Sequence, residues 1–62
     1  MKYALYYSMV IDGDKYPGFV FETTNPVELH QMIRYEIRRG SVDMFWLKIL
    51  KDGSIARRVE VC

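Results

Sequence analysis

The pattern of apolar and polar residues predicts four β-strands in this chain of 62 residues. In the first, residues 2–11 (KYALYYSMVI), alternate side chains share one face and β-favouring aromatic residues dominate. The other three strands are predicted at residues 18–23 (GFVFET), 42–50 (VDMFWLKIL) and 54–61 (SIARRVEV). The segment 42–50 is apolar on both faces, which indicates a central position in a sheet.

Turn signals separate these strands. Asp12-Gly13 is typical of a β-hairpin and lies in a turn predicted for residues 12–18. Because proline cannot donate to a sheet ladder, Pro17 indicates that the second strand begins after it and lies at an edge. Residues 51–53 (KDG) predict a second hairpin turn.

One helix is predicted at residues 26–39. Asn25 suits the N-cap, Pro26 suits the first helical position, and Glu28 completes a pattern similar to a capping box. Gly40 follows two arginines, as expected of a glycine C-cap at the negative end of the helix dipole. The packing face of this helix is predicted to hold Leu29, Met32, Ile33 and Ile37.

These elements predict an α+β fold of the ββαββ type in a single domain, residues 1–62. A four-stranded, mostly antiparallel sheet would carry one helix packed on one face. The strand order stays open at this point.

Two registers are open for the second hairpin. A two-residue turn sets Lys48 opposite Arg57, a like-charge pair. A three-residue turn with a left-handed Gly53 aligns Ile49 with Ile55 instead. We prefer the second register, because it collects apolar residues on one core face: Phe45, Leu47, Ile49, Ile55, Val59 and Val61.

The small size of the chain predicts a marginal core, because about 60 residues bury only about 60% of their unfolded surface. Cys62 is the one cysteine and His30 the one histidine. We therefore expect no internal disulfide, no zinc site, no other cofactor, and stabilisation by packing or oligomerisation. The lone cysteine, the lack of a signal-peptide pattern and the lack of a membrane-spanning apolar run favour the cytoplasm.

Catalysis is not expected. Any Ser-His or Cys-His pair would need His30. Cys62 is terminal, and the serines stand in no recognised nucleophile motif: Ser8, Ser41 and Ser54. The net charge of +1, with all five arginines in the second half, suits a protein partner with an acidic surface. It is far below the charge of a typical nucleic-acid-binding domain.

A basic stripe on the helix is the first candidate binding surface. Helical spacing puts His30, Arg34 and Arg38 in one line on the side away from the sheet. Arginine forks there could dock on an acidic protein patch or on phosphates. The alternative is an ordinary solvated helix face.

The sheet face away from the helix is the second candidate. It is predicted to show Ala4, Tyr6, Ser8, Val10, Met44, Trp46, Lys48, Arg58 and Glu60. An apolar patch on an uncovered sheet usually marks an interface. Three uses are open: a homodimer through this face or a sheet edge, a different protein partner, and a single-stranded nucleic-acid platform. The last would use Tyr6, Trp46, Lys48 and Arg58.

One charge falls on each predicted packing surface. Glu36 lies among the apolar helix positions, and Arg57 lies among those of the last strand. Because an unpaired buried charge is expensive, the two could pair across the helix–sheet gap. The alternative is that both reach water at the rim of the core, with Glu36 meeting Arg39.

The leading hypothesis is a small, non-catalytic, cytoplasmic binding protein that docks on a larger protein as an inhibitor or adaptor. Its size alone suggests a phage or mobile-element origin. The alternative is a nucleic-acid-binding regulator that uses arginines and exposed aromatic residues.

Overall fold

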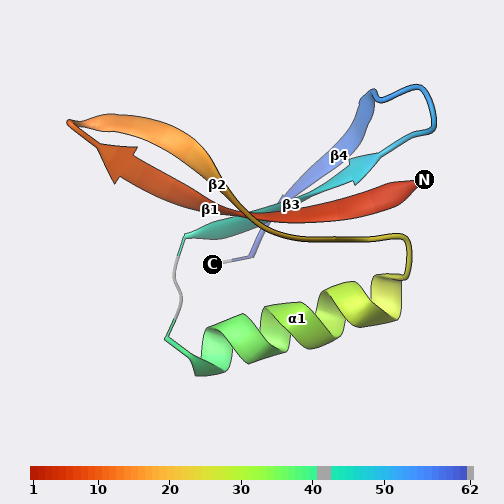
Figure 1. The fold of residues 1–62 in the computed structure, drawn as a ribbon, viewed down its shortest axis with the longest axis horizontal. Helices are drawn as coiled ribbons and strands as arrows, with labels where there is room; N and C mark the ends of the chain where they lie inside the picture. Colours follow the sequence, from red (N-terminus) through yellow and green to blue (C-terminus); the bar gives the residue numbers. More distant parts are fainter. Residues whose placement is uncertain (41–42, 62) are drawn as a thin grey trace.

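The computed structural model describes residues 1–40 and 43–61, and confirms the α+β fold with the element order ββαββ (Figure 1). The elements are β1 (Lys2–Ile11), β2 (Asp14–Thr23), α1 (Pro26–Arg38), β3 (Met44–Ile49) and β4 (Ile55–Glu60). Val42, the predicted start of the third strand, and the residues Ser41 and Cys62 lie outside the described residues.

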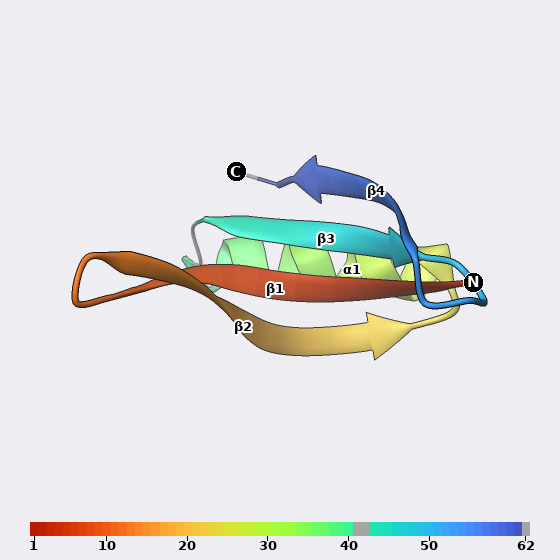
Figure 2. The ribbon, with the colours of Figure 1, turned by 90° about the horizontal axis from the view of Figure 1, so that it is seen from above.

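The four strands form one antiparallel sheet in the order β2-β1-β3-β4. Strand β3 is central, as its apolar faces predicted, and β2 and β4 are the edges (Figure 2). Helix α1 covers one face of this sheet (Figure 1). We call the opposite side of the sheet the outer face.

Strand β2 is an edge strand as predicted, but it begins at Asp14 and not after Pro17. The N–H of Ser8 donates to the carbonyl of Asp43 (2.7 Å), so the backbone of Ser8 turns away from β2. Pro17 is paired with Ser8, and by the alternation of an antiparallel ladder its nitrogen faces the free edge. The proline therefore removes no hydrogen bond from the sheet.

The turn of the first hairpin consists of Asp12 and Gly13 alone. Both have positive φ, 51° and 84°, as a two-residue type I′ turn requires. The hairpin continues past Tyr7, the last β1 residue that is paired with β3. Its end projects from the sheet as a two-stranded arm (Figures 1 and 2).

The helix ends follow the predicted caps with one difference. Asn25 is the N-cap and accepts a hydrogen bond from the Val27 N–H (2.9 Å). Glu28 does not reach the N-cap directly. The Thr23 hydroxyl donates to Glu28, while its oxygen accepts from the Asn25 N–H (3.0 Å). At the other end, Gly40 has φ +86° and donates its N–H to a carbonyl of the last turn.

The core is thin and lies between α1 and the two central strands. Leu5, Leu29 and Met44 form its fully buried centre. Tyr3 and Trp46 pack against it and meet edge to face, with ring centroids 5.8 Å apart. Partly buried apolar residues complete it: Tyr7, Val20, Phe21, Met32, Ile33 and Val61. The predicted packing residue Ile37 is instead 49% exposed, because it lies at the flank of the helix.

The second hairpin combines both registers that the sequence left open. Gly53 has φ +87° and Ile49 faces Ile55, as the preferred three-residue turn predicted. The register then shifts by one, which leaves Ala56 without a partner as a bulge. Beyond it Trp46, and not Phe45, faces Val59.

The predicted assignment of β3 side chains to the two faces is therefore wrong. Pairing with β1 sets Trp46 opposite Leu5 and Phe45 opposite Tyr6. Side chains opposite each other share a face, so Met44 and Trp46 pack under the helix. Their neighbours alternate to the outer face: Phe45, Leu47 and Ile49. The bulge supplies the one-residue slip that exchanges the faces.

Candidate functional site

Three aromatic rings gather at the centre of the outer face. Tyr6 of β1 stacks on Phe45 of β3, with ring centroids 5.3 Å apart and an interplanar angle of 14°. Phe19 of β2 meets Tyr6 edge to face at 5.8 Å. Phe45 is only 6% exposed although no helix covers this side of the sheet, whereas Phe19 is 61% exposed. The rings therefore form a small second core with one open flank.

Arg58 of β4 covers the other side of Phe45. Its guanidinium carbon lies 3.9 Å from the centroid of the Phe45 ring, in cation–π geometry. Glu60 fixes this position by accepting hydrogen bonds from Nε (2.9 Å) and Nη2 (3.2 Å) of Arg58. These bonds raise the pKa of Arg58 and lower the pKa of Glu60. The arginine is thus charged, oriented and spread over an apolar ring.

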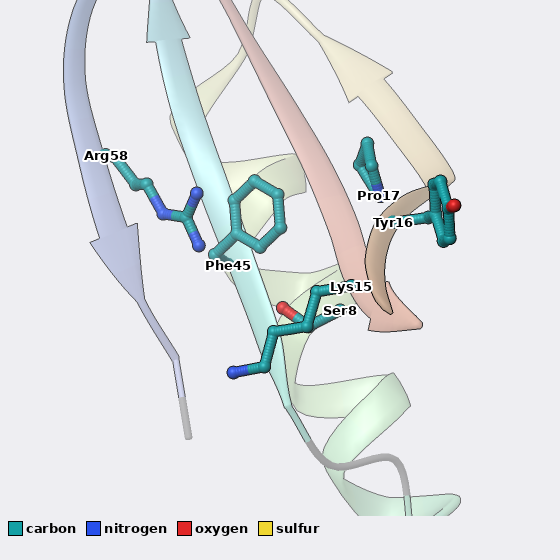
Figure 3. A pocket seen from close by; sticks show the side chains of 6 residues that line it. All are labelled: Ser8, Lys15, Tyr16, Pro17, Phe45 and Arg58. Carbon is teal, nitrogen blue, oxygen red and sulfur yellow. The ribbon is translucent and has the colours of Figure 1, made fainter. Parts of the chain in front are cut away.

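Two adjoining hollows extend from these rings. The larger has a volume of about 320 Å³ and is lined by Tyr6, Pro17, Phe45, Leu47, Ile55 and Arg58. The smaller, about 240 Å³, is lined by Ser8, Lys15, Tyr16, Pro17, Phe45 and Arg58 (Figure 3). Figure 3 shows Arg58 reaching from β4 toward Phe45, while Lys15 extends from β2 toward the same region. The outer face therefore has an apolar floor with cations at its rim.

The structure divides the predicted outer-face site residues between the two sides of the sheet. Tyr6 and Arg58 lie together on the outer face, as predicted. The assignment of Trp46 to this face is wrong, because its ring packs against Tyr3 beneath the sheet. Lys48, two residues from Trp46 in the same strand, is likewise on the helix side.

Sequence reasoning missed Phe19 and Phe45, the residues that complete this surface. A regular strand would put Phe19 and Phe21 on the same face. A bulge at Val20 separates them, since Phe21 faces Leu5 whereas Phe19 faces Tyr6. No local signal in the sequence marks either this bulge or the one in β4.

The basic stripe lies on the opposite side of the molecule. His30, Arg34 and Arg38 are all exposed on α1, as the helical spacing predicted. Arg39 is next to the stripe and holds its guanidinium 5.5 Å from the centroid of the Tyr35 ring. The structure therefore confirms that the stripe is exposed.

Glu36 is buried as its position predicted, with its side chain 4% exposed. The Tyr7 hydroxyl donates to its Oε2, and Nη1 of Arg39 lies 3.6 Å from its Oε1. The predicted pair with Arg57 is wrong, because Arg57 is exposed on the edge strand β4 whereas Glu36 is buried beside Tyr7 and Arg39. Of the alternative, the contact between Glu36 and Arg39 is confirmed and Arg57 reaches water, but Glu36 itself does not.

In residues 1–40 and 43–61, no three His, Cys, Asp or Glu side chains gather as a metal site would require. The same residues form no helix that is long and apolar enough to cross a membrane. Compared with protein-family models, with curated proteins and with solved structures, the chain matches none of them.

Proposed function

We propose that this chain is a non-catalytic binding protein that docks on a larger protein through its outer face, acting as an inhibitor or adaptor. The observation that carries the proposal is the aromatic cluster on a sheet face that no helix covers. Phe19 and Ile55 are 61% and 60% exposed on this face, beside the hollow that Tyr6 and Arg58 line. Exposed aromatic anchors beside an oriented arginine are the residue types that dominate protein interfaces.

The charges at the rim support a partner that presents carboxylates around an apolar contact. Lys15 and Arg58 flank the floor of the hollow. Arg58 is already stacked and hydrogen-bonded, so it would lose little side-chain entropy on binding. We place such a partner, and the protein itself, in the cytoplasm, and keep a phage or mobile-element origin as a proposal based on size.

The nucleic-acid alternative has less support. A stacking platform needs ring faces that are open to bases. Phe45 is enclosed between Tyr6 and Arg58, and Trp46 packs under the helix. The four residues that this reading required are thus divided between two sides of the sheet.

A pair of matched substitutions tests the proposal. Phe19→Asp places a charge on the outer face, whereas Val27→Asp places the same charge on α1 at a residue of similar exposure, 60%. Tagged wild-type chain would be used to capture partners from the native host, and binding would then be measured with the purified partner. We expect Phe19→Asp to weaken binding about thirtyfold or more, because losing an aromatic anchor costs about 2 kcal/mol or more.

Val27→Asp should leave the same affinity unchanged. Equal binding of both variants and the wild type would exclude the outer face as the docking surface. Capture of nucleic acid in place of protein, with affinity that falls about one decade per phosphate contact for each decade of salt, would favour the alternative.

A further inference from the structure

The free edge of β4 lacks the usual protections against pairing with another strand. From Arg57 to Glu60 the strand is regular and contains neither proline nor glycine. Figure 2 shows this edge open along the side of the sheet. The other edge, β2, is interrupted by Pro17 and by the bulge at Val20, which are two usual protections against pairing with another chain.

The backbone direction of β4 decides which residues can pair at this edge. The Val61 N–H donates to the Met44 carbonyl (2.9 Å), so Val61 turns its backbone groups toward β3. Val59 does the same by the alternation of an antiparallel ladder. Arg58 and Glu60 therefore point their N–H and C=O groups away from the sheet, toward any added strand.

The side-chain order in this stretch is self-complementary. Arg58 and Glu60 lie on the same face of β4, two residues apart with Val59 between them, and already form an ion pair of 2.9 Å. An antiparallel copy of β4 centred on Val59 would set Arg58 opposite Glu60 of the second copy, and the reverse. A shift by one step either way would set arginine opposite arginine or glutamate opposite glutamate, which is unfavourable.

We propose that β4 pairs with β4 of a second copy of this chain, with Val59 facing Val59 across a two-fold axis. Arg58 and Glu60 would exchange four backbone hydrogen bonds with their counterparts, and the four side chains would form a neutral network. The two-fold axis is perpendicular to the sheet, so the paired strands continue it into eight strands with both helices on one side.

The thin core supports a dimer, because a single copy leaves more surface exposed than is usual for its size. The chain exposes 4569 Å², above the roughly 4,200 Å² typical of a folded monomer of this mass. Pairing at β4 leaves both outer faces free on the same side of the dimer. The proposal does not rest on the docking function, although a dimer would offer a larger partner two equivalent sites.

Charge exchange tests the register directly. Arg58→Glu and Glu60→Arg each place like charges opposite one another, so each variant alone should raise the dimer dissociation constant at least tenfold. Mixing the two variants should restore a heterodimer, because every opposed pair is then of opposite sign. Both variants lose the ion pair within the chain, and mixing cannot restore that. Arg34→Glu is the matched control on α1 and should leave the dimer intact.

Sedimentation equilibrium at micromolar concentrations would measure these masses, with circular dichroism to confirm that each variant is folded. A monomeric wild type, or a mixture that stays monomeric, would overturn the proposal. If either variant fails to fold, Val59→Cys in a Cys62→Ser background gives an independent measurement. Mild oxidation should link two such chains, whereas Val10→Cys in the same background should stay single, and equal linking of both would count against the proposed axis.

Discussion

Removing the hydroxyl of Tyr7 should destabilise the protein severely. This hydroxyl donates to the carboxylate of Glu36, whose side chain is 4% exposed beneath the sheet. A hydrogen bond to a charged group contributes about 1.5–3 kcal/mol. A chain of this length has a total stability of roughly 3–9 kcal/mol. We therefore expect Tyr7→Phe to remove about a third of the free energy of unfolding.

Urea denaturation at neutral pH, followed by circular dichroism, measures this loss. The midpoint should fall while the slope with urea stays the same, because the surface exposed on unfolding does not change. In a thermal melt the midpoint should fall by about 10 °C or more, since 1 kcal/mol corresponds to roughly 4–8 °C in a domain of this size.

Tyr35→Phe is the matched control. Tyr35 is 55% exposed on α1, and phenylalanine keeps the ring that lies beside Arg39. This variant should stay within about 0.5 kcal/mol of the wild type. Equal effects of Tyr7→Phe and Tyr35→Phe would refute the reasoning. So would a double-mutant cycle in which Arg57→Leu, and not Tyr7→Phe, couples to Glu36→Gln.

Three further predictions concern the helix and the second hairpin. Asn25→Ala should cost about 1 kcal/mol in urea denaturation, because the first turn of α1 loses its N-cap acceptor; no change would contradict this capping. The double variant Arg34→Glu with Arg38→Glu should keep a cooperative melt, because each substitution lowers the free energy of unfolding by only about 0.3–1 kcal/mol. It should nevertheless slow association with an acidic partner. The stripe can act on a partner at the outer face, because the molecule is only 14 Å thick and charges act over about 30 Å at 0.01 M salt. Unchanged association rates in stopped-flow at that salt would show that the stripe is only a solvated face. The pKa of Asp52 is lowered chiefly by the hydrogen bond from the Ser54 hydroxyl. The stability that this bond contributes is therefore present above the ordinary pKa of an aspartate and is lost as the pH falls through the lowered pKa. Ser54→Ala should raise the pKa of Asp52 in an NMR titration, and an unchanged value would contradict the assigned cause.

Local chemistry made much of the fold predictable. The residues Asn25, Pro26 and Gly40 predicted the helix to within one residue. Asn25 accepts a hydrogen bond from an otherwise unpaired N–H, Pro26 lacks the N–H that would be unpaired in the first turn, and Gly40 adopts the positive φ that follows a helix end. Asp12-Gly13 located the first turn for a similar reason, since few residue pairs adopt positive φ. The turn is shorter than the predicted residues 12–18, because β2 already begins at Asp14. Caps and tight turns depend only on residues that are adjacent in the sequence, so they can be predicted without knowledge of the tertiary structure.

The faces of β3 could not be predicted in this way. The strand MFWLKI offers large apolar side chains to both sides, so its alternation does not say which side meets the helix. The pairing of Trp46 with Leu5 decides it, and that contact joins residues far apart in the chain. The bulges at Val20 and Ala56 then move Phe19 and Arg58 onto the face that holds Phe45.

The central claim, that a protein partner docks on the outer face, is tested most directly by NMR mapping. Isotopically labelled chain would be titrated with the partner captured from the native host, and amide and side-chain shifts would be followed. We predict chemical-shift changes concentrated at Tyr6, Phe19, Ile55 and Arg58. The signals of His30 should not move when the partner binds. Shifts confined to His30 and its neighbours on the stripe, with the outer-face signals unmoved, would contradict the account.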